Sequence, residues 1–475
     1  MSGVVSAFLL TAGMVAEATG GQLVSGDPGR VFDAISTDSR TLPPAPASAH
    51  AAGPLFIALS GPTFDGHAFL PDVIARGVAG VLVAVPPVIV GHAAVIVVPD
   101  PLAALQRLGH EVRRRSGARV VAITGSAGKT TTKEATAACL APRFRVFSSV
   151  GNLNNHIGLP LSLLELRHGA DVGVVELGMN HAGEIRTLVG LAEPDVRVWT
   201  NVGDAHIGHF GSADAIADAK AELLEGAGPA TVVVANADDP RVMHHVSRCP
   251  ATVRTFGFSA GADVRAVQVE DRGFDGTRAS VTTPWGPLSI ALALPGRANV
   301  LNVLAAATVA LQLGVPAADV VRAAAALRAL RQRGAVRDLA SGARLVDDSY
   351  NASPAAVSAM LATLAATATV GRRVAVIGEM RELGDGAAAL HTACGRAAGA
   401  AGIDVLVAIG GPAADGLIDG AREAGMTASQ LFRFADSATA AGAVAQIIRA
   451  GDLVLVKGSR GTQTELVSNR LTEVA

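Results

Sequence analysis

Short runs of β-branched and other apolar residues, each ending in a polar residue or glycine, constrain this chain more than any other feature. They lie at residues 119–124, 172–176, 196–202 and 231–236. Continuous apolar runs, unlike alternating ones, are typical of strands buried on both faces of a parallel sheet. Ligands of such sheets bind beyond the carboxyl ends of the strands. The polar residues at those ends are Thr124, Glu176, Asn201 and Asn236.

The same rhythm returns in the last third of the chain, where the runs lie at residues 345–349, 373–379, 404–410 and 452–458. The first hundred residues differ, because they mix short strands with a Pro/Ala-rich tract at 42–54 that suits a surface loop. A chain of 475 residues is too long for one ordinary core. We therefore expect three α/β domains: a small N-terminal domain (1–108), a central parallel-sheet domain (109–329) and a C-terminal Rossmann-like domain (330–475).

Composition excludes several classes of partner. A formal charge of -2 gives no global field that would attract nucleic acid or an acidic membrane, so we expect small-molecule partners. The 3 cysteines lie far apart without C-x-x-C spacing, which argues against a disulfide framework or a zinc site. No feature suggests an obligate interface, and we expect a cytoplasmic monomer.

Two apolar stretches could be mistaken for membrane or targeting segments. Residues 78–98 carry no charge, but Pro86, Pro87 and Gly91 interrupt them, so we expect two buried strands joined by a turn. Residues 4–15 lack the positive region of a signal peptide, and we interpret them as an amphipathic helix.

The strongest single motif is RVVAITGSAGKTTTKE, a strand that leads through a glycine-bracketed loop into a helix. Gly125 and Gly128 allow backbone N–H groups to turn toward phosphate oxygens. Lys129 can neutralise the β- and γ-phosphates of ATP, and Thr130 can hold Mg²⁺. Ile123 stands where the longer form of this loop has a glycine. The predicted ATP-binding residues of the loop are Gly125, Ser126, Ala127, Gly128, Lys129, Thr130 and Thr131.

Lys220 is anomalous for its position in the sequence. A helix over residues 213–224 would place it on the same face as the apolar Ile216, Leu223 and Leu224. Such a lysine either extends its ammonium to solvent, which is the common case, or is desolvated enough that its neutral amine becomes reactive.

Motifs along the whole chain carry a family resemblance. TGSAGKTTTKE, GNLNNHIGLPLSLL and VVELGMNHAGEI resemble, in this order, the central domain of the Mur ligases. STDSR (36–40) and LFIALSGPTFDGH (55–67) are similar to the family's UDP-sugar domain. DDSYNASP (347–354), GEMRELG (378–384) and VLVKGSRG (454–461) are similar to the member that adds D-alanyl-D-alanine.

The resemblance implies an ATP-dependent, ADP-forming amide ligase of peptidoglycan synthesis. ATP would phosphorylate the terminal carboxylate of UDP-N-acetylmuramoyl-tripeptide, and the amine of D-alanyl-D-alanine would attack the acyl phosphate. The alternatives are another amide ligase of the superfamily, such as a sibling Mur ligase or a folylpolyglutamate synthase, and a non-catalytic P-loop module.

The resemblance also implies a site for two Mg²⁺ ions. Glu176 is the predicted ligand at the end of a buried strand, with a surface glutamate as the alternative. His206 resembles a metal-site histidine of the family, although a lone histidine is ordinarily structural, and His209 is ambiguous. Lys220 would be carbamylated by CO₂ and help to hold the second ion. The predicted metal ligands are Thr130, Glu176, His206 and Lys220, and the predicted catalytic residues are Lys129, His206 and Lys220.

The remaining predicted residues also follow from the resemblance. Asn299 and Asn302 resemble amides that meet the nucleotide, with helix capping as the alternative. Ala298 stands where the family commonly has histidine. Arg333 is similar to an arginine that reaches the nucleotide on closure, although Gln332 precedes it where glycine is usual. The predicted substrate-binding residues are Ser39, Arg40, Asn155, Asp348, Tyr350 and Asn351, of which the last three could instead form only a turn.

Overall fold

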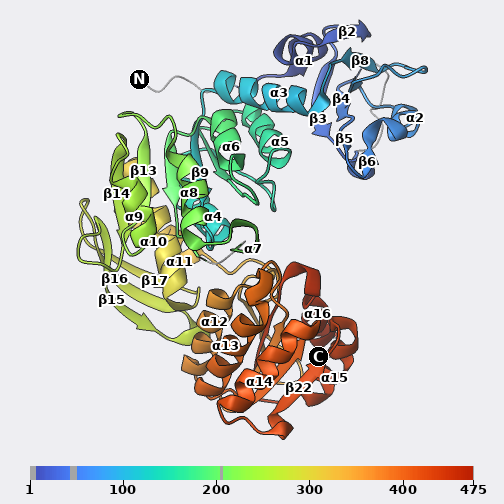
Figure 1. Ribbon diagram of the computed structural model, residues 1–475. Helices are drawn as coiled ribbons and strands as arrows, with labels where there is room; N and C mark the ends of the chain where they lie inside the picture. Colours follow the sequence, from blue (N-terminus) through green and yellow to red (C-terminus); the bar gives the residue numbers. More distant parts are fainter. Residues whose placement is uncertain (1–6, 43–50, 204–206, 474–475) are drawn as a thin grey trace. The chain divides into compact units, whose positions relative to one another are not determined.

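The computed structural model describes residues 7–42, 51–203 and 207–473, and it is an α/β structure with three main sheets (Figure 1). Each of the three expected α/β blocks has its own sheet. The chain forms two compact units, of which the first comprises Met1–Ile123, Arg143–Met179 and Gly183–Arg197. The second comprises Thr124–Pro142, Asn180–Ala182 and Val198–Ala475. The domain boundaries at 108/109 and 329/330 stay predictions.

The N-terminal sheet has the strand order β1-β3-β4-β7-β8-β2. The strands β3, β4, β7 and β8 pair in parallel, and β1 and β2 pair antiparallel at the edges. One face packs on α1 and α3 and the other on α2, because successive side chains of a strand point to opposite faces. The bounds are β1 Leu10–Thr11, α1 Ala12–Thr19, β2 Gln22–Ser25, β3 Val31–Ser36, β4 Gly53–Ile57, α2 Leu70–Ala75, β7 Gly80–Val83, β8 Ala94–Val97 and α3 Pro101–Ser116. The two short strands β5 (Ser60–Gly61) and β6 (Phe64–Asp65) form a separate hairpin.

The expected helix over residues 4–15 is wrong in its bounds. The chain first forms β1, and α1 begins only at Ala12. Thr11 sets this start, because its hydroxyl accepts a hydrogen bond from Met14 N–H at 3.3 Å and so caps the helix. Residues 4–6 lie outside the described part of the chain.

The prediction for residues 78–98 is confirmed, since they form β7 and β8 with a turn between them. In the described part of the chain, no helix is long and apolar enough to cross a membrane. Of the Pro/Ala-rich tract, residues 43–50 lie outside the described residues, and Gly53 already begins β4.

The second sheet has nine strands in the order β10-β11-β9-β12-β13-β14-β15-β16-β17. The predicted runs form β9, β11, β12 and β13, and the pairs β10–β11, β11–β9, β13–β14 and β14–β15 are parallel. The strand bounds are β9 Arg119–Thr124, β10 Val146–Ser148, β11 Val172–Glu176, β12 Val196–Trp199, β13 Val232–Asn236, β14 Thr252–Gly257, β15 Val264–Asp271, β16 Thr277–Thr282 and β17 Leu288–Leu292. The helices of this region are α4 Lys129–Leu140, α5 Gly158–Leu164, α6 Glu184–Ala192, α7 Ile207–Phe210, α8 Ala213–Ala221, α9 Pro240–Val246, α10 Gly296–Gln312 and α11 Ala317–Ala326.

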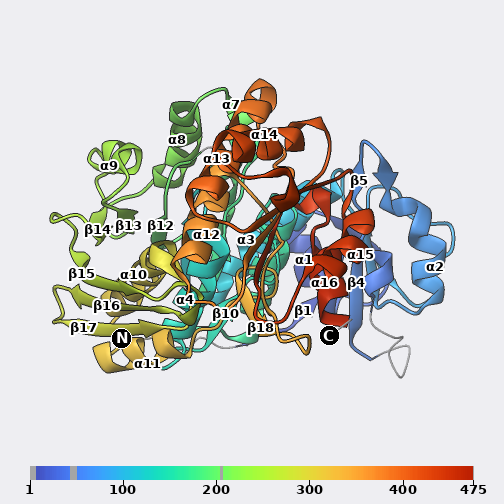
Figure 2. The ribbon, with the colours of Figure 1, turned by 90° about the horizontal axis from the view of Figure 1, so that it is seen from below.

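The antiparallel end of this sheet was not predicted. β15, β16 and β17 lie side by side in Figure 2 and pair antiparallel. Buried and exposed residues alternate along β16 and β17, because one face contacts α10 and α11 and the other faces solvent. Such strands lack the continuous apolar runs by which the parallel strands were found.

The C-terminal sheet has the order β18-β19-β23-β20-β21-β22, and all its pairs except β18–β19 are parallel. The helices α12, α13 and α14 cover one face, and α15 and α16 cover the other (Figure 1). The predicted runs form β19, β20, β21 and β23, whereas the edge strands β18 and β22 were missed. The bounds are β18 Ala335–Asp338, β19 Arg344–Asp348, α12 Pro354–Ala366, β20 Arg373–Gly378, α13 Ala387–Ala400, β21 Val405–Ile409, α14 Asp415–Glu423, β22 Leu431–Phe434, α15 Ser437–Ile447, β23 Leu453–Lys457 and α16 Glu465–Glu473.

The turn between β15 and β16 packs into the core of this C-terminal region. Phe274, in the turn, is 3% exposed and belongs to the cluster formed by α12, α13 and α14. Its N–H donates to Thr367 Oγ1 at 2.9 Å, and Arg344 forms an ion pair with Asp275 at 2.7 Å. The hairpin is therefore a second attachment of the C-terminal region, besides the chain connection at residues 327–334.

Candidate functional site

The phosphate loop follows β9 directly and ends where α4 begins, at Lys129. Gly125 has a φ of 149° and Gly128 a φ of 81°, in the region that favours glycine. A Cβ on Gly125 would lie 1.9 Å from Thr200 Oγ1, and one on Gly128 would lie 2.2 Å from Asn302 Oδ1. The conformation and the packing of the loop therefore both require glycine at these two positions.

Asn201 holds this loop, a role that the sequence analysis did not assign. Ser126 N–H donates to Asn201 O at 3.1 Å, and Ala127 N–H donates to Asn201 Oδ1 at 2.8 Å. Thr200 Oγ1 donates to Ala127 O at 2.7 Å. Because the amides of Ser126 and Ala127 bond within the protein, we expect phosphate to meet the first turn of α4. The position of Asn201 at a strand end was the available signal, but its partner could not be read from the sequence.

Lys220 lies on the buried face of α8, as predicted from the helix pattern. Its side chain is 2% exposed, and Ile216 and Leu223 on the same face are fully buried. Burial lowers the pKa of the Lys220 ammonium well below its usual value, and the positive charge of Lys129 lowers it further. The Lys129 ammonium itself donates to Gly125 O at 2.8 Å. Lys220 therefore does not extend to solvent, and its surroundings favour the neutral, nucleophilic amine.

Glu176 ends β11 with 4% of its surface exposed, so the alternative of a surface glutamate is wrong. Asn154 Nδ2 donates to Glu176 Oε1 at 2.8 Å, which fixes the orientation of the carboxylate. Among the described residues, no three His, Cys, Asp or Glu side chains gather as a metal site. His206 lies outside the described residues, and so does the side chain of His209, so their predicted roles stay untested.

Asn299 and Asn302 do not cap α10, because the helix already begins at Gly296. Asn299 Nδ2 donates to Pro295 O at 2.8 Å, and Asn302 Nδ2 donates to Asn299 Oδ1 at 3.2 Å. Thr132 of α4 donates its hydroxyl hydrogen to Asn302 Oδ1 at 3.2 Å. Asn302 therefore connects α10 with the phosphate-loop helix, directly behind Gly128.

Lys133 is a further buried lysine of α4 that was not among the predicted site residues. It lies one helical turn after Lys129, is 1% exposed and pairs with Glu134 at 3.0 Å. A signal for it exists in the composition, because only 4 of the 39 basic residues are lysine. The other three are Lys129 and Lys220, which were predicted to act in the site, and Lys457 at the end of β23.

In the C-terminal region, Asp348 at the end of β19 pairs with Lys457 at the end of β23, with 2.6 Å between Oδ2 and Nζ. Lys457 also donates to Asn351 O at 2.8 Å. Burial raises the pKa of the Asp348 carboxyl, and the charges of Lys457 and Arg333 oppose this rise. A buried ion pair thus stands where the ligands of a parallel sheet are expected.

Arg333 and Tyr350 are brought together as well. The Arg333 guanidinium lies 3.9 Å from the centre of the Tyr350 ring, and Tyr350 N–H donates to Gln332 O at 3.1 Å. Gln332 has a φ of 62°, a left-handed conformation that glycine adopts without strain. This explains why the departure from the family's usual glycine at Gln332 matters for the backbone.

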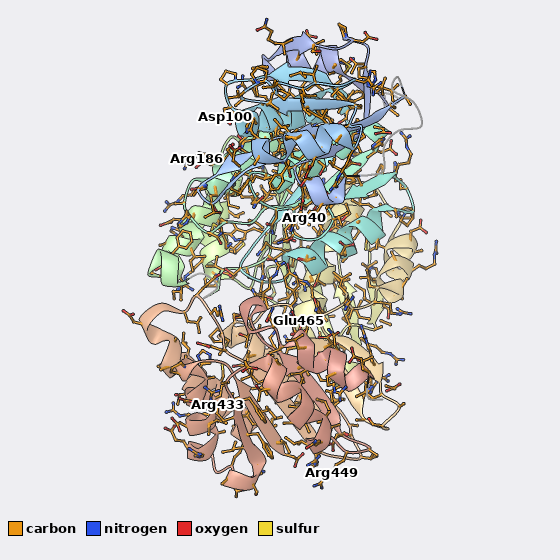
Figure 3. The ribbon with its side chains drawn as sticks, turned by 90° about the vertical axis from the view of Figure 1, so that its right-hand side faces the viewer. Arg40, Asp100, Arg186, Arg433, Arg449 and Glu465 are labelled. Carbon is orange, nitrogen blue, oxygen red and sulfur yellow. The ribbon has the colours of Figure 1, made fainter. Side chains whose placement is uncertain are left out.

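Of the predicted substrate-binding residues, Arg40 and Asn155 are exposed and Ser39 is half-buried. Arg40, labelled in Figure 3, forms an ion pair with Asp38 at 2.7 Å, and its hydrogen bonds lower the pKa of the Asp38 carboxyl to about 2. The carbonyl of Ser39 accepts a hydrogen bond from Arg76 at 3.0 Å. Asn155 Oδ1 accepts from Gly158 N–H at 2.8 Å, at the start of α5. These contacts fix local turns and leave the predicted substrate roles untested.

Comparisons with known proteins extend the resemblance to the whole chain. The Mur ligase middle domain matches residues 123–310, and the Mur ligase glutamate ligase domain matches residues 332–460. A UDP-N-acetylmuramoyl-tripeptide--D-alanyl-D-alanine ligase of Escherichia coli is 36% identical over 448 residues, which span 93% of this chain and 94% of the relative. The chain belongs to the Mur ligase family.

Other Mur ligases agree with this assignment over the full length. The ligase of the same description from Bacillus subtilis is 33% identical and covers 93% of this chain and 94% of its own. The structure of MurF from Acinetobacter baumannii has a TM-score of 0.87 at 32% identity, covering 99% of this chain and 100% of that chain. MurF from Thermotoga maritima, in complex with ADP, has a TM-score of 0.78 at 27% identity, covering 92% and 97%. A folylpolyglutamate synthase from Mycobacterium tuberculosis shares the fold alone, at 18% identity.

Proposed function

We propose that this protein is the ATP-dependent Mur ligase that joins D-alanyl-D-alanine to UDP-N-acetylmuramoyl-tripeptide through an acyl phosphate, forming the pentapeptide precursor of peptidoglycan. The observation that carries the proposal is the full-length similarity to ligases of this description, which includes the C-terminal third. The phosphate loop supplies the expected ATP site. We place the reaction in the cytoplasm and expect the enzyme to act as a monomer.

Each of the three regions takes one substrate in this proposal. The N-terminal domain, residues 1–108, holds the UDP-sugar with Ser39 and Arg40. The central domain, residues 109–329, holds ATP on the phosphate loop, with Asn299 and Asn302 near the nucleotide. The C-terminal domain, residues 330–475, holds the dipeptide. Arg333 reaches the nucleotide when the enzyme closes.

The residues of the central domain fit magnesium. The Glu176 carboxylate and the Thr130 hydroxyl are hard oxygen donors of the kind that Mg²⁺ prefers. A neutral Lys220 amine can attack CO₂ and become an anionic carbamate, which would supply a further oxygen ligand together with His206. When bound, Mg²⁺ would neutralise charge on the phosphates during transfer.

The chain's own groups account for the binding and ordering of the reactants. The amides at the start of α4 and the Lys129 ammonium hold the phosphates near the substrate carboxylate. In the C-terminal domain, Asp348 offers a carboxylate to the dipeptide ammonium, and Asn351 and Tyr350 line the same strand end. The ammonium must lose a proton to solvent before its nitrogen attacks the acyl phosphate. The C–N bond of the amide then forms as the C–O bond to the phosphate breaks, and phosphate leaves.

The identity of the acceptor is tested by offering the enzyme a mixture of amines with ATP and UDP-N-acetylmuramoyl-tripeptide. The mixture contains D-alanyl-D-alanine, D-glutamate, lysine and diaminopimelate, and mass spectrometry identifies the product. We expect only the pentapeptide. A product that carries a single amino acid, or extension of a folate by glutamate in a parallel reaction, would assign the chain to another ligase.

The carbamate is tested by NMR on protein labelled with ¹⁵N at the lysine side chains and supplied with ¹³C-bicarbonate. The chain is well suited to this measurement, because it contains only 4 lysines. We expect one ¹⁵N–¹³C pair, absent from Lys220→Met. Four bare lysine amines in the presence of ATP and bicarbonate would rule out carbamylation.

A further inference from the structure

The loop of residues 379–384 follows β20 and forms hydrogen bonds with several other segments of the second unit. Glu379 Oε2 accepts a hydrogen bond from Gly411 N–H at 2.6 Å, at the end of β21. Glu379 O accepts from the Thr462 hydroxyl at 3.0 Å. Arg381 N–H donates to Ser459 Oγ at 3.0 Å, two residues after Lys457. The loop therefore joins the ends of β21 and β23, beside the Asp348–Lys457 pair.

The buried side chain of His391 on α13 forms a hydrogen bond with the backbone of this loop. Its side chain is fully buried, and its Nε2 accepts a hydrogen bond from Met380 N–H at 2.9 Å. A backbone N–H can only donate, so Nε2 carries no proton and Nδ1 donates to Ala387 O at 2.7 Å. Both ring nitrogens are thus engaged, and the imidazole fixes the loop to the start of α13.

The far end of the loop reaches α7. Glu382 has a φ of 66°, a left-handed conformation that non-glycine residues rarely adopt. In this conformation Glu382 O accepts a hydrogen bond from Gly208 N–H at 3.2 Å. Gly208 follows His206, the predicted metal ligand, by two residues in the sequence.

The approach of the loop to α7 requires a glycine. A Cβ at Gly208 would lie 2.9 Å from Glu382 O and 3.1 Å from Gly384 N. Cβ atoms essentially never lie within 3.0 Å of another atom, so a side chain at Gly208 would require Glu382 O to move away. Strained backbone that is held by several contacts is a feature of sites where position matters for function.

We propose that His391 is a positioning residue for the ligation step, and that it acts through the 379–384 loop. The loop fixes Ser459, which follows Lys457 by two residues, beside the proposed dipeptide site. Through Glu382 O it also holds the Gly208 segment of the central region. His391 touches no reactant in this arrangement. The inference rests on the proposed function, because it assigns the loop to placing the dipeptide amine and not to binding ATP.

The test compares His391→Leu, His391→Gln and Gly208→Ala in steady-state kinetics. Leucine removes the acceptor for Met380 N–H, whereas the glutamine side-chain oxygen can replace it. We expect kcat/KM for D-alanyl-D-alanine to fall on the order of 10- to 100-fold in His391→Leu and Gly208→Ala, as for misplaced reactants. The KM for ATP should stay within about twofold, and His391→Gln should recover most of the loss.

Gly442→Ala is the matched control, because Gly442 lies in α15 and a Cβ there would have no atom within 4 Å. We expect its kcat/KM for the dipeptide to equal that of the wild type. Gly208 is exposed, so Gly208→Ala tests the proposal even if His391→Leu fails to fold. Wild-type kcat/KM for the dipeptide in Gly208→Ala would overturn the inference, as would a KM for ATP that rises in parallel. If the wild-type enzyme itself does not use the dipeptide, the proposed function fails, which is a separate result.

Discussion

At the scale of single residues, the reactivity of Lys220 depends on its surroundings. Its side chain is only 2% exposed, which decides between the two alternatives that its apolar helix face left open. The contribution of Lys129 to its lowered pKa could not be predicted, because the phosphate loop and α8 meet only in the folded chain. The role of Asn201 in holding the phosphate loop, and His391 as a whole, were missed for the same reason, since their partners lie elsewhere in the sequence.

Lys220→Met should separate stability from activity. The folded state lowers the pKa of Lys220 below its unfolded value, so between these two values the unfolded chain binds more protons. The free energy of unfolding of the wild type therefore rises with pH in this window, and Lys220 contributes no such slope once it is methionine. In bicarbonate-free buffer we expect the variant to be more stable than the wild type at pH 7, with a smaller difference at pH 9, as measured by urea unfolding.

The same variant should lose ligase activity on the order of 100-fold or more, because metal-held charge stabilisation is worth several kcal/mol. A variant that keeps its activity would remove Lys220 from the catalytic residues. Lys220→Arg is the control for charge, since arginine keeps a cation but cannot form the carbamate, and we expect it to lose activity as well.

Asp348 and Lys457 should behave as a coupled pair. Asp348→Asn leaves a buried ammonium without its counter-charge, and we expect the free energy of unfolding to fall by about 3–5 kcal/mol. Lys457→Met added to Asp348→Asn should recover most of this loss. A double-mutant cycle in urea checks the expectation, and additive effects of the two changes would show that the pair is not ionised together.

At the scale of elements, the sequence pattern predicted strands that are continuous apolar runs, and it missed strands in which buried and exposed residues alternate. The buried strands β9, β11, β12 and β13 of the second sheet and β19, β20, β21 and β23 of the C-terminal sheet were found because both of their faces are buried, whereas the parallel strand β14 was missed. The antiparallel strands β15–β17 and the edge strands β18 and β22 were missed, since the local pattern of a half-exposed strand is weak. The start of α1 was misplaced because the cap at Thr11 outweighs the apolar run before it.

The turn of the β15–β16 hairpin should be an energetic anchor. Phe274→Ala removes an aromatic ring from the core of the C-terminal region, and we expect a loss of about 3–5 kcal/mol in the free energy of unfolding. Val267→Ala on the same hairpin is the control, because Val267 is 44% exposed and should cost less than about 1 kcal/mol. Urea unfolding followed by circular dichroism measures both, and equal small effects would show that the turn is not an anchor.

At the scale of the whole molecule, the fold class and the family were predictable from the sequence. Motifs in the N-terminal, central and C-terminal thirds pointed to one family, and relatives match over 93% of the chain. The arrangement of the site was less predictable, because the contacts of the loop of residues 379–384 with β21, β23, α13 and α7 join segments that lie far apart in the sequence. The sequence identified GEMRELG as a motif, but not what holds it.

In the proposed function, the enzyme consumes ATP only to join two specific substrates. The most direct test measures ADP release by the purified enzyme while each reactant is left out in turn. We predict rapid release only when ATP, UDP-N-acetylmuramoyl-tripeptide and D-alanyl-D-alanine are all present, with the pentapeptide formed in equal amount. Rapid ADP release without the tripeptide or without the dipeptide would contradict this account.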